Sequence, residues 1–235
     1  MKDLETQYAA QAQRWSEEQY ADPAGYLRHR AELIVSLGPP LETGDRVLDL
    51  ACGDGGLALH LAGLDYRGAD ANAAMVAAAR RHGVNAVEAD LNDYEPAEPV
   101  AATTVFRALY YARDRRAFFR RVAGYTEKKL VFDLNPRQYR LEDVRADLAA
   151  AGLDALELRA FLVPQTYALP GVVQRGLVAL EPTPLARLAL RFRFTYLCAA
   201  STSSAAGSSA AEAAAESESA LESAPVPRSS RPRSS

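Results

Sequence analysis

Three aspartates and one glycine-rich turn carry the residue types that bind polar ligands. Asp49 lies in the apolar run Val47–Leu50, and the turn Cys52–Gly56 follows it almost directly. Asp70 and Asp90 end two later apolar runs. Asp70 comes about 20 positions after Asp49, where a doubly wound sheet places an acceptor for ribose hydroxyls. Glycines in such a turn let the backbone take φ > 0 and approach a ligand closely. The pattern indicates a ribose-bearing ligand.

Alternating strand and helix patterns bring the three aspartates to one edge of a sheet. The apolar runs are typical of buried parallel strands, because they do not alternate cleanly with polar residues, and a helix is expected after the glycine turn. A lone Gly-x-Gly often only connects a strand to a helix, but three carboxylates at one edge favour a ligand site. The expected strands are Val47–Leu50, Leu64–Ala69, Asn85–Ala89, Val100–Leu109, Lys129–Leu134, Leu156–Val163 and Phe192–Ala199, with helices over Ala73–His82, Asp114–Thr126 and Leu141–Ala151.

These motifs, in this order and spacing, resemble the class I S-adenosylmethionine-dependent methyltransferases. The resemblance is carried by Val47–Gly56, by Gly68–Asp70 with Met75 on the following helix, and by Glu88–Leu91. One position departs from the family pattern, since Ala51 stands where the family often has the first glycine of its loop. The resemblance implies an α/β, Rossmann-like three-layer sandwich with a seven-stranded, mostly parallel sheet and an antiparallel edge hairpin.

The resemblance covers roughly Tyr8 to Ala200 and divides the chain into three parts. Residues 1–40 are expected to form a helical arm, 41–200 the cofactor-binding domain, and 201–235 a disordered tail rich in Ser and Ala. The segment Pro164–Arg187 is interpreted as an insertion that caps the substrate side. In the arm, two readings stay open: Trp15, Tyr20 and Arg28 form a lid over the cofactor, or the aromatic residues pack on the sheet edge.

The resemblance implies S-adenosylmethionine as cofactor and assigns a role to each aspartate. Asp49 would organise the glycine loop and the methionyl amino group; it could cap the next helix instead or in addition. Asp70 would accept both ribose hydroxyls, and Asp90, with the backbone N–H of Leu91, would bind adenine. The complete implied cofactor site is Asp49, Ala51, Cys52, Gly53, Asp54, Gly55, Asp70, Ala71, Met75, Asp90, Leu91 and Arg107.

Two of these residues have structural alternatives that the sequence leaves open. Met75 would lie against an adenine face or simply belong to the core. Arg107 would lie near the methionyl carboxylate and the transferring methyl group, or form a structural ion pair.

No clear catalytic base is visible in the sequence. The candidates are His29, Arg107 and Tyr110, and the three histidines are scattered without metal-ligand spacing. We therefore expect a metal-independent transfer in which the acceptor is held in line with the methyl group, and in which orientation and exclusion of water supply most of the acceleration.

Charge and motif content favour a small-molecule acceptor. The net charge is −3 with both signs mixed, and the basic cluster Arg113–Arg116, with Arg120 and Arg121, is better read as a solvated helix face than as a nucleic-acid surface. The motif Asp133–Pro136 follows the fifth expected strand, and Arg137 stands where amino methyltransferases of nucleic acids have a second proline. A nicotinamide-dependent oxidoreductase and a catalytically silent cofactor-binding protein remain as alternatives.

The sequence also predicts a soluble cytoplasmic protein. The N-terminus lacks the apolar segment of a signal peptide, and no stretch approaches the length of a membrane span. Cys52 and Cys198 are expected to be free thiols. The oligomeric state is not indicated.

Overall fold

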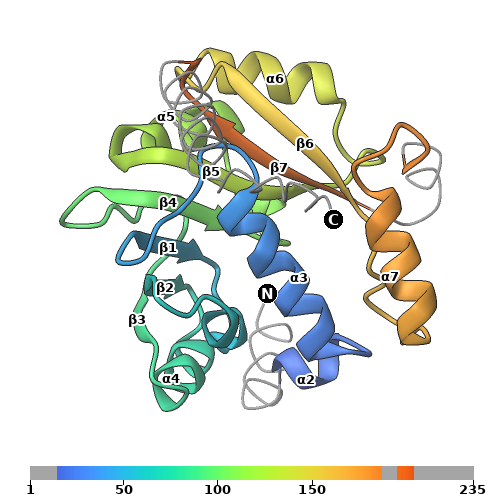
Figure 1. Ribbon diagram of the computed structural model, residues 1–235. Helices are drawn as coiled ribbons and strands as arrows, with labels where there is room; N and C mark the ends of the chain where they lie inside the picture. The colour runs from blue at the N-terminus through green and yellow to red at the C-terminus, as the bar shows by residue number, and fades with distance from the viewer. Residues whose placement is uncertain (1–14, 187–194, 204–235) are drawn as a thin grey trace, which may run out of the picture.

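The computed structural model describes residues 15–186 and 195–203 and contains one seven-stranded sheet in the order β3-β2-β1-β4-β5-β7-β6 (Figure 1). The strands are β1 Arg46–Leu50, β2 Asp65–Asp70, β3 Asn85–Glu88, β4 Val100–Val105, β5 Thr126–Leu134, β6 Ala155–Phe161 and β7 Thr195–Ser201. The helices are α2 Trp15–Gln19, α3 Pro23–Ser36, α4 Ala73–Arg81, α5 Arg115–Tyr125, α6 Leu141–Ala149 and α7 Gly171–Leu180, with 3-10 turns η2 Gly56–His60 and η3 Leu109–Tyr111.

The strand pairing confirms the predicted fold class. Strand β1 is parallel to β2 and β4, β3 to β2, and β5 to β4, whereas β7 is antiparallel to both β5 and β6. The strand order reverses between β1 and β4, and ligands of such sheets bind beyond the carboxyl ends of the strands at this point. Because β7 is reversed, its first residue and the last residue of β6 lie at the same edge.

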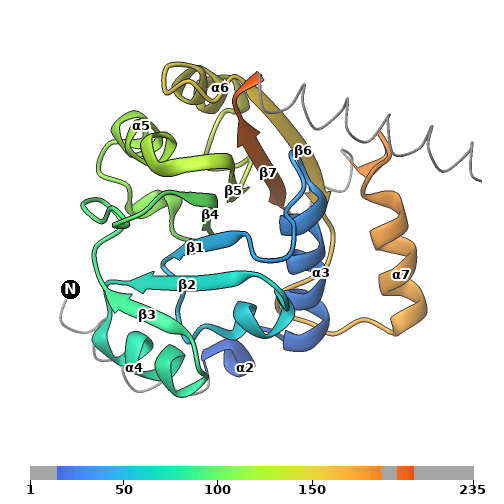
Figure 2. The ribbon, with the colours of Figure 1, turned by 60° about the vertical axis from the view of Figure 1, so that its left-hand side comes forward.

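Helices cover both faces of the sheet and give three layers (Figure 2). Strand β1 shows why: Leu48 packs in the core under α5 and α6, and Val47 packs in the core under α3. Successive strand residues point to opposite faces, so an uninterrupted apolar run needs cover on both sides. Helix α3 begins at Pro23, and the carboxylate of Asp22 accepts a hydrogen bond from the Gly25 N–H at 3.0 Å.

The helix predicted after the glycine turn is wrong in kind and length. The chain forms only the 3-10 turn Gly56–His60, and β2 begins at Asp65. The flanking glycines explain the difference, because Gly55 has φ 74° at the start and Gly63 has φ 88° where the chain turns into β2. Neither conformation continues an α-helix.

Other element boundaries also differ from the prediction by one to four residues. The fourth strand ends at Val105 instead of Leu109. Strand β7 includes the buried Ser201, and the N–H of Ser203 donates to Asp154 at 2.7 Å, so the folded part extends past the predicted boundary at residue 200. Residues 204–235, where disorder was predicted, and residues 1–14 of the arm lie outside the described residues.

The basic cluster on α5 is tied to the domain by ion pairs. Arg113 contacts Asp90 at 2.8 Å, and Arg115 and Arg116 both contact Asp147. These three arginines therefore have carboxylate partners within the chain, in agreement with a structural role. Among residues 15–186 and 195–203, no helix is both long enough and apolar enough to span a bilayer.

A buried lysine fixes the end of α3 on the sheet. Lys129 is fully buried in β5, and its Nζ donates to the carbonyls of Val35 at 3.0 Å and Leu37 at 2.7 Å. Burial lowers the pKa of this amine to about 7. The last carbonyls of a helix have no partner within the helix, and Lys129 supplies one.

Lys129 should make stability depend on pH. Its pKa is lower in the folded protein than in the unfolded chain, so the unfolded chain binds more protons between about pH 7 and 10. The free energy of unfolding should therefore rise across this window. Below the window, the buried amine is charged, and the full loss of stability caused by burying that charge should be present. Urea unfolding of the wild type and Lys129→Met at several pH values measures this. The rise should disappear in Lys129→Met and persist in the partly exposed neighbour variant Lys128→Met; an equal slope in all three would contradict it.

Candidate functional site

The glycine turn lies at the carboxyl end of β1 and is shaped by left-handed backbone conformations. Gly53 has φ 57° and Gly55 has φ 74°, and a β-carbon on Gly55 would lie 2.8 Å from a methyl group of Val84. Ala51 has φ 63°, although a β-carbon disfavours this region. Its N–H donates to the carbonyl of Ala69 at 2.7 Å, which ties the turn to the end of β2.

Asp70 joins the glycine turn to the start of α4. Its carboxylate accepts hydrogen bonds from the N–H of Gly53 and the N–H of Asn72, both at 2.9 Å. Burial raises the pKa of Asp70, and the two backbone donors oppose this. Each carboxylate oxygen keeps a second lone pair, so Asp70 can still accept two hydroxyl donors. Its role at a ribose stays a prediction with suitable geometry.

Asp49 lies deeper than the other two aspartates and is bound by two hydroxyls. It accepts from Tyr66 at 2.5 Å and from Thr104 at 2.7 Å, and it is 4% exposed. Burial raises its pKa to about 6, against the effect of both hydroxyls. The helix-cap alternative is wrong, because these side chains and not helix N–H groups are its partners. Its role toward the methionyl amino group stays a prediction.

The residues expected around adenine differ in how deeply they are buried. Asp90 is on the surface, where it binds Arg113 and both the backbone and the side-chain N–H of Asn92. Leu91 is buried in the core. Met75 is also buried, in a cluster with Ala78 and Trp15, which matches the core alternative. Ala71 is exposed, and Cys52 is buried with a free thiol.

Asp54 fastens the N-terminal arm to the glycine turn. It is 3% exposed, and it accepts hydrogen bonds from the N–H and Oγ of Ser16, at 2.8 and 2.5 Å. The neighbouring Trp15 lies over the turn, since a β-carbon on Gly53 would be 3.3 Å from its ring. Tyr20 is buried and stacks on Tyr26. Of the three predicted lid residues, Trp15 contacts the turn, Tyr20 packs in the core and Arg28 is exposed.

The arm should open and close with ligand. Helix α2 has no buried residue, whereas α3 has eight. Hydrogen exchange in the free protein should therefore be faster in α2 than in α3, and S-adenosylmethionine should slow it in α2. Ser16→Ala removes one of the two bonds to Asp54 and should speed exchange in α2 only. Strong protection of α2 that is unchanged by ligand would remove the arm from the site.

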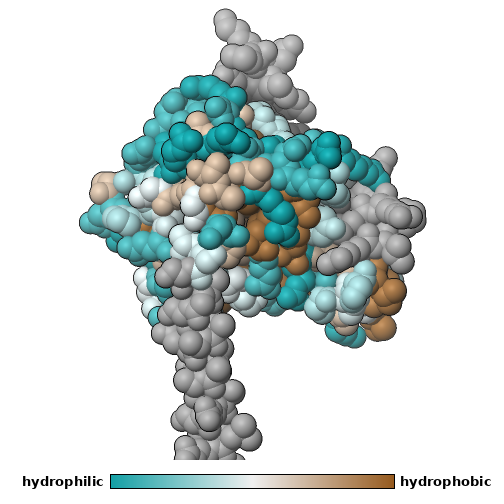
Figure 3. All heavy atoms as spheres, turned by 90° about the horizontal axis from the view of Figure 1, so that it is seen from above, coloured by the Kyte–Doolittle hydropathy of each residue, from teal (hydrophilic) through white to brown (hydrophobic). Residues whose placement is uncertain are grey.

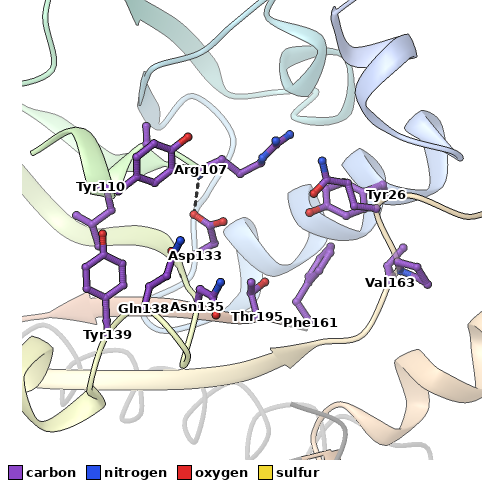
Figure 4. Close-up of a pocket in the computed structure, with 14 residues that line it drawn as sticks. Tyr26, Arg107, Tyr110, Asp133, Asn135, Gln138, Tyr139, Phe161, Val163 and Thr195 are labelled. Carbon is purple, nitrogen blue, oxygen red and sulfur yellow. Dashed lines mark hydrogen bonds between the residues drawn. The ribbon is translucent and has the colours of Figure 1, made fainter. Parts of the chain in front are cut away.

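A cavity of about 400 Å³ lies at the carboxyl ends of β4 and β5, within the size range of small-ligand sites (Figure 4). Its walls come from α3, from the segments that follow β4 and β5, and from the end of β6 and the start of β7. Tyr26 and Phe161 form a buried aromatic part, and Tyr110 lies at the exposed rim, 52% accessible. Helix α7 contributes no wall; only Pro164 and Gln165 of the predicted capping insertion do.

Arg107 and Asp133 bring opposite charges to this cavity. Arg107 has φ 53°, and its backbone N–H donates to the carboxylate of Asp133 at 2.7 Å. Backbone strain of this kind gathers at functional sites. Sequence reasoning noticed Asp133 only as part of a motif that it rejected. The position at the carboxyl end of β5 was the signal that could have identified it.

Arg30 is a second residue that the sequence analysis missed. It is 4% exposed, its Nη2 donates to the hydroxyl of Tyr26 at 2.8 Å, and its guanidinium lies 4.3 Å from the ring centre of Phe106. Burial lowers the pKa of Arg30, but Tyr26, Tyr20, Asp133 and Asp49 raise it by more. Its Nε is buried without a hydrogen-bond partner. Its spacing of one helical turn from Tyr26 could have shown that it faces inward.

His29 is not placed to act as a catalytic base. It does not line the cavity, and its Nε2 lies 2.7 Å from Glu181 and its Nδ1 3.3 Å from Glu32. Burial lowers the pKa of His29, but the carboxylates of Glu181 and Glu32 raise it by more. The pKa therefore lies above the ordinary value for histidine. Glu181 follows α7, on which Val172 and Val173 are exposed. His29 therefore connects α3 to the C-terminal end of α7. Figure 3 shows an apolar patch at the right of the molecule, on the side where Figure 1 places α7.

The comparisons with known proteins agree with this architecture. The sequence profile of the family described as "Methyltransferase domain" matches residues 47–129, from β1 into β5. Over these residues the chain is similar to methyltransferase domains. No curated protein shows a significant sequence match to this chain.

Solved structures show the same fold at low sequence identity. A chain of the complex between the Trm112 methyltransferase activator and a methyltransferase from Haloferax volcanii has a TM-score of 0.59 at 19% identity, covering 83% of this chain and 97% of that one. Magnesium protoporphyrin IX methyltransferase from Synechocystis PCC 6803 with bound SAM gives 0.52 at 16%, covering 78% and 82%. The [4+2]-cyclase SpnF gives 0.51 at 18%, covering 74% and 80%.

Proposed function

We propose that the methyltransferase transfers a methyl group from S-adenosylmethionine to a small-molecule acceptor without a metal ion. The observation that carries the cofactor assignment is the position of Asp70. This aspartate ends β2 and is held by the backbone of the glycine turn and of α4, beside the point where the strand order reverses. Its carboxylate suits a ribose diol, and the adjoining turn suits the close approach of a ligand.

The charged groups near the cavity fit the amino-acid end of the same cofactor. Arg30 is buried with an unpartnered Nε, and a carboxylate is the group that best satisfies a buried guanidinium. Asp49 lies close enough to influence the pKa of Arg30 and marks the acidic side of the site. Arg107 remains the alternative partner for the carboxylate.

S-adenosylmethionine supplies a methyl group bonded to a positively charged sulfur, so the protein needs chiefly to hold the acceptor in line. The cavity supports this role, because Tyr26 and Phe161 give it a dry aromatic side and Asp133 a polar one. Positioning and exclusion of water are then the main contributions of the chain. Among the described residues, no three His, Cys, Asp or Glu side chains lie together as a candidate metal site.

A mass spectrum of the gently denatured protein tests the cofactor. S-adenosylmethionine or S-adenosylhomocysteine should be released, whereas a nicotinamide dinucleotide would support the alternative oxidoreductase. Methyl transfer itself is tested with S-adenosylmethionine labelled on the methyl group, mixed with a small-molecule cell extract. A labelled small molecule is expected. Cofactor binding without any labelled product would favour a catalytically silent protein or a different reaction on this fold, as the name of the cyclase SpnF illustrates.

A further inference from the structure

The cavity contains two opposite charges that do not neutralise each other. Arg107 and Asp133 both line it and are both partly buried, yet no atoms of their side chains approach within ion-pair distance. Within the described residues, the Arg107 guanidinium forms no hydrogen bond or ion pair, and Asp133 accepts only from the Arg107 backbone. Both charges act on Tyr26, a residue of α3 that lines the cavity.

The backbone of Arg107 explains why the two charges stay apart. Its left-handed conformation turns the N–H toward Asp133, and the side chain then extends along the cavity toward Tyr26 (Figure 4). Asp133 lies near the carboxyl end of β5, and its carboxylate faces the backbone of Arg107. One of its oxygens is bound by the N–H, and the other remains available to a ligand.

Two half-buried charges without partners favour a ligand that offers the opposite charge to each. A ligand with only an amine would meet the unpaired guanidinium, and a ligand with only an anionic group would meet the unpaired carboxylate. Either contact costs free energy in a cavity that is partly closed to water. A ligand with both groups satisfies both residues, and its apolar body would lie against Tyr26, Phe161 and Tyr139.

The amino and carboxylate groups of the cofactor are the alternative ligand for Asp133 and Arg107. Arg30 offers that carboxylate a buried guanidinium whose Nε has no partner, and this leaves Arg107 for the acceptor. Resting on the proposed function, we propose that the methyl acceptor is a zwitterion, a small molecule with an amine bound by Asp133 and an anionic group bound by Arg107, joined by an apolar or aromatic body.

Matched phenyl compounds test the proposal by calorimetry on protein saturated with S-adenosylhomocysteine. The probes are phenylalanine and 3-amino-3-phenylpropionate, which carry both charges, 2-phenylethylamine, which lacks the carboxylate, and 3-phenylpropionate, which lacks the amine. At least one zwitterion should bind tenfold or more tightly than both single-charge compounds. Equal affinities, or no binding of any probe, would overturn the proposal.

Two substitutions then assign each charge. Arg107→Met should remove the advantage of the zwitterion over the amine, and Asp133→Asn, which keeps an acceptor for the Arg107 N–H, should remove its advantage over the carboxylate. The surface variants Arg140→Met and Asp143→Asn should behave as wild type. If instead Arg107→Met and Asp133→Asn weaken S-adenosylhomocysteine tenfold, the pair belongs to the cofactor and the proposal is wrong.

The same measurements separate this proposal from the proposed function. Wild-type protein that fails to bind S-adenosylhomocysteine would contradict the cofactor assignment. The probes are then titrated into the protein alone, where a tenfold preference for a zwitterion that both substitutions abolish would still support the charge pair as its binding site. If wild-type protein without S-adenosylhomocysteine shows no preference for a zwitterion over the single-charge probes, the zwitterion proposal is wrong as well.

Discussion

Replacing Asp70 with alanine is expected to weaken S-adenosylmethionine binding by about 1.5–3 kcal/mol, the scale of losing charge-assisted hydrogen bonds. The substitution removes the acceptor for the ribose hydroxyls. It also releases the N–H groups of Gly53 and Asn72, so the glycine turn loses the bond that shapes it. Calorimetric titration of the wild type and Asp70→Ala with S-adenosylmethionine measures the loss.

Asp65 provides the matched control for this change. It lies at the opposite end of the same strand, and its partly exposed carboxylate pairs with Arg46 and Arg67. Asp65→Ala should leave the affinity within a factor of two or so of wild type, since surface pairs contribute little. Asp70→Ala that is folded, by its thermal transition, and binds as tightly as Asp65→Ala would contradict the ribose assignment.

Replacing Arg30 with methionine should abolish recognition of the cofactor's carboxylate. Wild-type protein should bind S-adenosylmethionine more tightly than its decarboxylated analogue by about 1.5–3 kcal/mol, because the carboxylate meets a desolvated guanidinium. In Arg30→Met this preference should fall close to zero. Methionine is a suitable replacement, since exchanging a buried charge for an apolar side chain of similar volume often preserves the fold.

Arg107→Met, measured with the same two ligands, is the internal comparison. If Arg30 binds the carboxylate, Arg107→Met keeps the preference for S-adenosylmethionine. A preference that disappears in Arg107→Met and survives in Arg30→Met would return the carboxylate to Arg107, as the sequence first indicated. Thermal unfolding of each variant distinguishes lost recognition from lost structure.

The central strands could be predicted from sequence because they are buried on both faces. Runs such as Val47–Leu50 are apolar apart from one aspartate, so their position is clear, and the aspartates after or within them fall at the expected edge. The contact between Asp70 and the glycine turn follows from this topology alone. The 3-10 turn Gly56–His60 was missed because local glycine conformations, and not the periodicity of Leu57 and Leu61, decide its geometry.

The charged residues of the site were harder to predict, because their roles depend on partners far away in the chain. His29 was a candidate base until the fold brought Glu181 to its ring, a partner 152 positions away. Arg30, its neighbour, is buried among aromatic rings from three different segments. Spacing within one helix shows which side chains share a face, but it does not show what the rest of the chain places against that face.

The hydrogen bond between Asp133 and the backbone of Arg107 limits how this site can evolve. The carboxylate that lines the cavity also holds a strained residue in place, so a change at position 133 alters the shape of the cavity together with its charge. Asparagine keeps the acceptor oxygen and is the change that separates the two effects. New acceptor preferences should therefore arise more readily at Gln138 or Tyr110, whose side chains are exposed at the rim and hold no backbone in position.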